Sequence, residues 1–299
     1  MNFSGKLTKL KLVLFCHILN PFWYSREKRR KIRTSYLVKT ADNYLQKYLP
    51  KSGEIPEQEV VNNDKNEKIF SIWLQGEKDA PDIIKSCFRS IRKHCKQELI
   101  VLDEKTLFDY ITLPDVIVQK YKDGKIHQAH FADICRVELL YRYGGIWLDA
   151  TAFVTEPIPQ NIINSDFFMF LVNPDWDFGY SFVQNCFIRA RKGSYLLAAW
   201  RAMIFSYWMH ENAELDYYLH QLSFRTLVLH DNRAKKYFEQ MPHVLQDGTH
   251  MLWWGYKDKP FDETLFKKII KDAFFQKTTY KGLDNIIPGS FADVIIKMK

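Results

Sequence analysis

Residues 127–157, with the sequence HQAHFADICRVELLYRYGGIWLDATAFVTEP, decide how this chain folds. In their first half, apolar side chains recur at steps of three and four residues, which predicts a helix over residues 126–143 with one face in a core. Gly144 and Gly145 follow, and a glycine pair directly after an apolar helix is typical of a left-handed C-terminal cap. The apolar residues 146–148 then predict a short buried strand.

The predicted strand leads directly to Asp149, and this position points to a binding site. Open α/β sheets bind ligands in the crevice outside the carboxyl ends of their strands. Asp133 and Arg136 lie three residues apart on the preceding helix, so they share one face and can point into the same crevice. The alternative is structural: Asp133 and Arg136 form a weak surface ion pair, and Asp149 caps a turn.

The string ADICRVELLYRYGGIWLDAT, residues 132–151, resembles the signature of the bacterial capsular polysaccharide synthesis proteins. That family belongs with glycosyltransferase family 32 and, more distantly, with the glycosylating clostridial toxins. Ala132 replaces the usual serine, and Thr151, usual in the capsular branch, stands where the broader family's Asp-x-Asp motif has its second acid. The residues that carry the resemblance are Asp133, Ile134, Arg136, Leu139, Leu140, Tyr141, Tyr143, Gly144, Gly145, Ile146, Trp147, Asp149, Ala150 and Thr151.

The resemblance implies an α/β fold: a GT-A-type (Rossmann-like) nucleotide-sugar-binding domain over residues 66–299, after an N-terminal helical region and linker at residues 1–65. It implies transfer of a single sugar, with retention of configuration, in capsule or exopolysaccharide synthesis. The expected donor is a nucleotide-diphosphate sugar, above all a UDP-sugar, and the expected acceptor is a saccharide or lipid-linked oligosaccharide. Asp133 and Arg136 are expected to bind hydroxyls of the donor sugar.

Upstream of the signature, residues 68–76, 81–94 and 98–102 predict a strand, a helix and a second strand. This order and spacing are typical of a βαβ unit, and therefore of a parallel sheet. The first strand carries Trp73, which can stack on a nucleotide base, and Gln75, which can hydrogen bond to it. The alternative is that Trp73 is an ordinary core residue.

Two later segments carry candidate catalytic residues. Residues 182–195, FVQNCFIRARKGSY, resemble the family's block around Asn185, and residues 215–222, LDYYLHQL, resemble its Asp-Tyr-Phe segment, which begins a helix at Asp216. Cationic, oxocarbenium-like transition states need carboxylate and amide oxygens near the sugar ring. Asn185 and Asp216 are therefore expected on the reactive face of the sugar, with Asp149 as the third catalytic residue. A helix dipole would favour Asp216 even without a catalytic role.

Negative charge develops on the leaving diphosphate, so a divalent cation, a lysine or a histidine must be placed beside it in advance. Asp149 is expected to bind Mn²⁺ or Mg²⁺. One carboxylate rarely holds such an ion alone. His243 and His250 are candidates to complete the metal site, and Lys259 and Lys277 are candidates to bind the donor; the sequence does not rank these four.

Composition restricts the class of protein. A chain of 299 residues with 46% hydrophobic and 15% aromatic residues can bury a full core, which excludes a largely disordered protein. The formal charge of +8 suits an anionic partner. The basic excess is concentrated in residues 6–33 without a nucleic-acid motif, so no nucleic acid is expected. Five scattered cysteines without a C-x-x-C pair predict reduced thiols.

The amino-terminal segment predicts membrane association. An apolar helical stripe over residues 7–18, beside early lysines, precedes the basic cluster REKRRKIR at residues 26–33. This combination suits a helix in the headgroups of an anionic leaflet, so the expected location is peripheral, on the cytoplasmic face of the cell membrane. The alternative is a helix packed on the protein's own body. Residues 37–65 predict a helix and then a polar linker, and no apolar run reaches the roughly 18 residues of a membrane span.

The sequence also allows a function of another class. The missing second acid and Ala132 favour a non-catalytic, membrane-docked sugar-nucleotide-binding or scaffold protein of the same pathway. Metal-dependent hydrolysis of a donor sugar would count against that alternative.

Overall fold

The computed structural model describes residues 3–15, 25–51, 53–56, 67–176 and 179–298. A five-stranded mixed sheet forms the centre of the molecule, in the order β2-β1-β3-β6-β5. Its strands are β1 (Ile69–Ile72), β2 (Leu99–Leu102), β3 (Gly145–Leu148), β5 (Phe167–Leu171) and β6 (Val183–Ala190). Strand β1 is parallel to β2 and β3, whereas β6 is antiparallel to β3 and β5. The predicted α/β class and parallel βαβ unit are confirmed.

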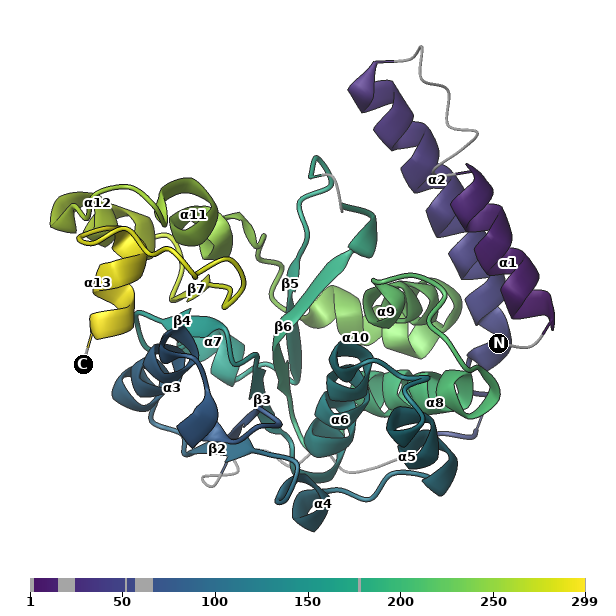
Figure 1. Ribbon diagram of the computed structural model, residues 1–299. Helices are drawn as coiled ribbons and strands as arrows, with labels where there is room; N and C mark the ends of the chain where they lie inside the picture. Colours follow the sequence, from purple (N-terminus) through teal and green to yellow (C-terminus); the bar gives the residue numbers. More distant parts are fainter. Residues whose placement is uncertain (1–2, 16–24, 52, 57–66, 177–178, 299) are drawn as a thin grey trace.

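Helices cover both faces of this sheet (Figure 1). The helices that follow β1 in the chain are α3 (Asp82–His94), α4 (Leu107–Tyr110), α5 (Asp115–Lys122), α6 (Gln128–Tyr143), α7 (Gln160–Ile163), α8 (Tyr195–His210), α9 (Leu219–His230), α10 (Asn232–Gln240), α11 (Asp247–Tyr256), α12 (Glu263–Ile270) and α13 (Phe291–Lys297). Because side chains alternate across a strand, each face has its own core. Phe70 and Trp147 pack with α6, α8 and α9, and Ile69 and Leu148 pack with α3, α11 and α13.

A second, two-stranded sheet brings the carboxyl-terminal part of the chain to the signature. Strand β4 (Ala152–Val154) pairs antiparallel with β7 (Phe275–Lys277), and Ala152 lies opposite Lys277. The N–H of Thr278 donates to the carbonyl of Thr151 over 2.9 Å. This pairing places two segments more than 100 residues apart in sequence beside each other.

The glycine pair after α6 has a different role from the predicted cap. Gly144 has φ 66° and ψ −162°, a combination outside the left-handed helical region and essentially restricted to glycine. Its N–H donates to the carbonyl of Leu140, which closes the helix. Gly145, with φ 95°, is already the first residue of β3. The glycines therefore turn the chain from helix into strand without an intervening loop.

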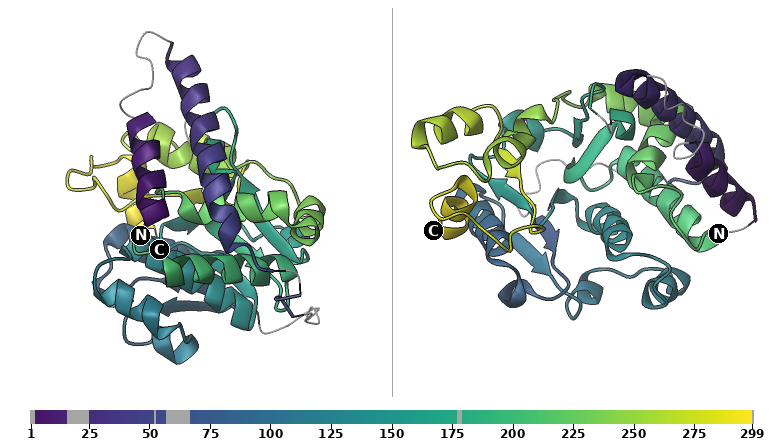
Figure 2. Two further views of the ribbon diagram at one scale, coloured as in Figure 1. Left: turned by 90° about the vertical axis from the view of Figure 1, so that its right-hand side faces the viewer. Right: turned by 45° about the horizontal axis from the view of Figure 1, so that its top comes forward.

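Two amino-terminal helices, α1 (Phe3–Val13) and α2 (Arg26–Leu45), lie side by side, and the amino end of α2 projects away from the sheet (Figures 1 and 2). The other end of α2 packs on the body, where the hydroxyls of Tyr44 and Tyr48 donate to the buried carboxylate of Glu211. No helix within the described ranges is both long and apolar enough to cross a membrane. The polar linker predicted to end at residue 65 falls largely within 57–66, outside the described residues.

Candidate active site

A pocket of about 550 Å³ opens at the carboxyl ends of β1 and β3. Strand β2, which follows β1 in the chain, pairs with one edge of β1, and β3 pairs with the other edge. The direction in which strands are added to the sheet therefore reverses between β1 and β3. Open α/β sheets bind ligands at such switch points. Trp73, which follows β1, and Asp149, which follows β3, both line the pocket.

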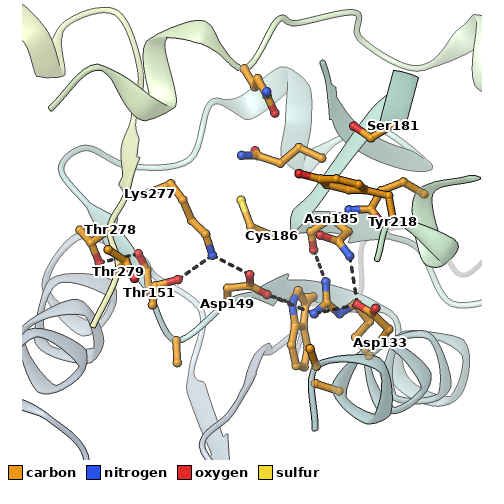
Figure 3. A pocket seen from close by; sticks show the side chains of 18 of the residues that line it. Asp133, Asp149, Thr151, Ser181, Asn185, Cys186, Tyr218, Lys277, Thr278 and Thr279 are labelled. Carbon is orange, nitrogen blue, oxygen red and sulfur yellow. Dashed lines mark hydrogen bonds and ion pairs between the residues drawn. The ribbon is translucent and has the colours of Figure 1, made fainter. Parts of the chain in front are cut away.

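Asp149 is held at the floor of this pocket by three donors (Figure 3). One carboxylate oxygen accepts the indole N–H of Trp147 over 2.8 Å and lies 3.3 Å from the guanidinium of Arg136. The other accepts the ammonium of Lys277 over 2.7 Å. Burial opposes the charge on Asp149, but Lys277 and Arg136 outweigh burial and lower its pKa to about 2. Asp149 is therefore ionised at neutral pH.

Asp133, Arg136 and Asn185 form a network beside Asp149. The guanidinium of Arg136 lies 3.1 Å from the carboxylate of Asp133 and donates to the backbone carbonyl of Asn185 over 2.5 Å. The side-chain amide of Asn185 donates to the same Asp133 oxygen over 3.0 Å. Arg136 also lies over the ring of Trp147, 4.8 Å from its centroid. The predicted pairing of Asp133 with Arg136 thus occurs inside the pocket, not on the surface.

His220 supports this network and was not singled out from the sequence. Its Nδ1 lies 3.2 Å from the amide nitrogen of Asn185, and its ring stacks on Trp200 with 4.0 Å between centroids. Burial lowers the pKa of His220 to about 3, against the attraction of Asp133. A neutral ring that accepts at Nδ1 fixes the orientation of the Asn185 amide. The only signal in the sequence was the presence of a histidine in the LDYYLHQL segment, and nothing local indicated that this histidine contacts Asn185.

Lys277 reaches Asp149 from β7. Its ammonium donates to the Asp149 carboxylate and, over 2.6 Å, to the hydroxyl of Thr151. Figure 3 shows this side chain extending from β7 across the pocket. Of the four late candidates, Lys277 and His250 line the pocket, and Lys277 contacts Asp149. Residues 278–281, which follow Lys277, also line the pocket, and the ring of Tyr280 packs edge-on against Trp73 at 5.2 Å.

Gln184, Gln246 and His250 form a polar wall in the lining of this pocket. The amide nitrogen of Gln184 lies 3.1 Å from Nε2 of His250, and Thr249 lies 2.8 Å from Nδ1. Burial lowers the pKa of His250 to about 4, so its ring is neutral at pH 7. The side-chain oxygen of Gln184 and the side-chain nitrogen of Gln246 are buried without a protein hydrogen bond. Such groups are matched by the hydroxyls of a bound ligand or by water.

Asp216 lies at the edge of the pocket rather than in its lining. Its carboxylate accepts the N–H of Tyr218 over 2.8 Å, just before α9 begins. Burial raises the pKa of Asp216. The next two residues, Tyr217 and Tyr218, do line the pocket. Asp216 thus positions the aromatic pair, and the sequence predicted no role for either tyrosine.

Three predicted site residues lie elsewhere. Gln75 is exposed and lines a neighbouring hollow, because β1 ends at Ile72 and the chain turns before it reaches Gln75. Lys259 is exposed, with its ammonium 4.5 Å from the ring centroid of Tyr256. His243 lies 3.2 Å from the carbonyl of Phe238, outside the pocket. The structure therefore does not bring these three side chains to Asp149.

The expected metal ligands do not form a site in this arrangement. Asp149 and His250 line one pocket without His243, and both ring nitrogens of His250 have side-chain partners. Within the described part of the chain, no group of three or more His, Cys, Asp or Glu side chains is arranged to hold a metal ion. The donors around Asp149 are cationic or N–H groups, which compete with a divalent ion for the carboxylate.

Comparison with known proteins extends over nearly the whole chain. A family model described as capsular polysaccharide synthesis protein matches residues 21–293, a range that contains every residue lining the pocket. No curated protein matches the chain, and no solved structure matches it.

Proposed function

Since this chain belongs to the capsular polysaccharide synthesis protein family, we propose that it is a glycosyltransferase that moves one sugar from a nucleotide-diphosphate sugar to a saccharide acceptor. One observation carries the proposal: hydroxyl-binding groups and cations converge in a single pocket. Asp133 and Asn185 lie on one side of Asp149, and Lys277 lies on the other. The volume of about 550 Å³ suits a ligand of nucleotide-sugar size.

The donor is proposed to lie with its base near Trp73 and its diphosphate near Lys277. Trp73 and Tyr280 offer aromatic surface at one end of the pocket, and flat rings stack on bases. Lys277 and Lys281 offer positive charge along the same segment. A UDP-sugar is the proposed donor, and the domain is proposed to be of GT-A type and related to glycosyltransferase family 32.

The sugar is proposed to lie against Asp133, Asn185 and the polar wall. The unpartnered side-chain oxygen of Gln184 can accept a hydrogen bond from a sugar hydroxyl, and the unpartnered side-chain nitrogen of Gln246 can donate hydrogen bonds to one. A site built to hydrogen bond a hydroxyl rejects a sugar that lacks it, because its buried polar groups are then left unpaired. Gln184 and Gln246 are thus the proposed determinants of donor specificity.

The acceptor is proposed to enter past Tyr217 and Tyr218. Tyr217 is 70% exposed to solvent. Flat aromatic side chains provide surface for the apolar faces of sugars. Asp216 holds this turn and carries a carboxyl whose pKa is raised by burial. Asp216, at the edge of the pocket, would position the acceptor hydroxyl, and Asn185 would stabilise positive charge on the donor ring. The transfer is proposed to retain the configuration of the sugar.

The acceptor is proposed to be lipid-linked, with the protein on the cytoplasmic face of the cell membrane. Leu7, Leu10 and Leu14 are exposed on the amino-terminal segment that includes α1, next to exposed Lys6 and Lys11. Apolar side chains flanked by basic ones favour binding to an anionic headgroup region. The projecting basic end of α2 would strengthen that attraction (Figure 2).

The experiment that tests the proposal measures binding and chemistry together. The full-length protein is screened by thermal shift against UDP, GDP, CMP and their sugars, since a ligand at 100 times its Kd stabilises the folded state by about 2.7 kcal/mol. Release of nucleotide from the matching sugar is then measured, with and without Mn²⁺. We expect a shift, and slow release without an added acceptor.

Matched variants locate the activity. Asp149→Asn is expected to keep the fold and to lower nucleotide release by about 10²- to 10³-fold, the size typical of losing one preorganised electrostatic contact. Asp123→Asn is the control, because Asp123 is an exposed carboxylate paired with Lys125 outside the pocket. A shift without release would favour the non-catalytic binding protein. No shift with any of the nucleotides or sugars would refute the proposed function.

A further inference from the structure

The ammonium of Lys277 lies between the Asp149 carboxylate and the Thr151 hydroxyl, the two polar side chains that the Asp-Ala-Thr motif offers to a cation. Asp149 and Thr151 are two residues apart, and Lys277 contacts both, the carboxylate over 2.7 Å and the hydroxyl over 2.6 Å. A metal at Asp149 would need either the carboxylate oxygen that Lys277 contacts or the other oxygen, which Trp147 and Arg136 contact. Lysine and metal are thus alternatives at one position.

The backbone fixes Lys277 at that position. Its strand pairs with β4, opposite Ala152, and Thr278 donates to the carbonyl of Thr151 through both its N–H and its hydroxyl, each over 2.9 Å. The Lys277 side chain is 24% exposed. A lysine tied at its backbone and at its ammonium loses little further freedom when a ligand arrives.

Charge balance favours the ammonium. Asp133 and Asp149 carry two negative charges, and Arg136 and Lys277 carry two positive ones, so this centre is neutral before a ligand binds. A divalent ion in place of the ammonium would leave an excess of one positive charge. Because Thr151 contributes a neutral hydroxyl and no second acid, the monovalent cation matches the single charge of Asp149. The ammonium also has three N–H donors. Asp149 and Thr151 accept two, which leaves one for a ligand oxygen in the pocket.

We infer that Lys277, held by Asp149 and Thr151, takes the place of a divalent metal, so that this transferase binds the donor diphosphate and stabilises its departure without a metal ion. This inference rests on the proposed function and deepens it. Lys281, which lines the same pocket four residues later, supplies a second positive charge along the diphosphate. Arg136, engaged with Asp133 and the Asn185 carbonyl, orients the sugar side.

The step balances without a metal. The bond between the anomeric carbon and the phosphate oxygen breaks, and its electron pair stays on the diphosphate. The acceptor oxygen bonds to the anomeric carbon, and its proton passes to the released diphosphate. Lys277 remains protonated and donates a hydrogen bond to the oxygen on which negative charge develops, which is a charge-assisted hydrogen bond of the strong class.

The first test compares the full-length protein in EDTA and in Mn²⁺. Calorimetry with UDP, GDP and pyrophosphate as probes measures affinity, and nucleotide release from the corresponding sugars measures turnover. We expect affinity and release in EDTA within about twofold of their values in Mn²⁺. Binding and release only with Mn²⁺ would overturn the inference and leave the proposed function standing. No binding in either condition would overturn both.

Two variants then assign the effect to Lys277. Lys277→Met is expected to weaken binding of the diphosphate probes about 10- to 100-fold, as for a charged hydrogen bond, whereas Lys267→Met, at an exposed lysine of α12, is not. Thr151→Asp combined with Lys277→Ala restores two carboxylates and removes the ammonium, so it is expected to bind UDP only with Mn²⁺. Circular dichroism checks folding. A double variant that binds equally well in EDTA would contradict the exchange of lysine for metal.

Discussion

Substitution of Gly145 by alanine tests how the signature shapes the site. Gly145 has φ 95° and begins β3. A Cβ placed on it would lie 2.4 Å from the backbone oxygen of Lys68. That oxygen also accepts the N–H of Ile146 over 3.0 Å, the hydrogen bond with which β1 and β3 begin to pair. Backbone, not a flexible side chain, blocks the methyl group.

The magnitude follows from three contributions. A non-glycine residue at this φ costs about 1–3 kcal/mol. Forcing a methyl group into packed backbone costs about 1–3 kcal/mol, and the loss of the hydrogen bond from Ile146 to Lys68 costs about 1 kcal/mol. Gly145→Ala should therefore lower the free energy of unfolding by about 3–7 kcal/mol. That is a large part of the 5–15 kcal/mol typical of a folded protein.

Urea unfolding followed by circular dichroism measures this loss. Gly255→Ala is the matched control, because Gly255 lies in α11 and an added Cβ would meet no atom beyond its chain neighbours and its own helix backbone within 4 Å. Alanine is favoured over glycine in a helix by up to about 1 kcal/mol, so this control should be as stable as the original protein or slightly more so. A Gly145→Ala protein within 1 kcal/mol of the original would refute the reasoning.

Two further predictions concern pH and membranes. Burial lowers the pKa of His220 to about 3 and of His250 to about 4. As the pH falls below about 6.5, both histidines therefore become protonated in the unfolded chain before they do so in the folded protein. Each should lower the free energy of unfolding by about 2 kcal/mol by pH 5. Urea unfolding at pH values from 7.5 to 5 measures this loss of stability. His250→Gln should reduce the slope of stability against pH. A stability that does not change with pH would contradict the prediction. Leu10→Ser should lower the affinity for phosphatidylglycerol vesicles, measured by sedimentation, about tenfold or more. Leu229→Ser, at another exposed leucine, in α9, should not. Equal sedimentation of both variants would argue against docking through α1.

Local sequence was sufficient where neighbouring residues determine the structure. The helical periodicity before Gly144 predicted α6, and the apolar residues after Gly145 predicted β3. The βαβ unit followed from the order of strand, helix and strand, because a helical crossover returns the chain to the end of the sheet where the first strand began, so that the two strands run parallel. Asp133 and Arg136 are fixed relative to each other by the helix, so their proximity was also predictable.

The late candidates could not be ranked in this way, because their positions depend on contacts between distant segments. Lys277 and Asp149 are 128 residues apart. Their contact depends on the register of β7 on β4, and a shift by one residue would turn Lys277 to the opposite face. His243 and Lys259 differ from Lys277 in no local feature that decides which of the three enters the pocket.

The buried side chains that contact the site residues could not be predicted from the sequence either. His220 and Gln184 lie in apolar stretches whose pattern predicts core, and the polar wall forms only where α11 packs beside β6. The sequence by itself determined the class of fold and the position of Asp149 at the end of a buried strand, because helical and strand periodicity are local properties. Only the tertiary structure decided which cation meets Asp149, because strand register and packing between distant segments are set by the whole core.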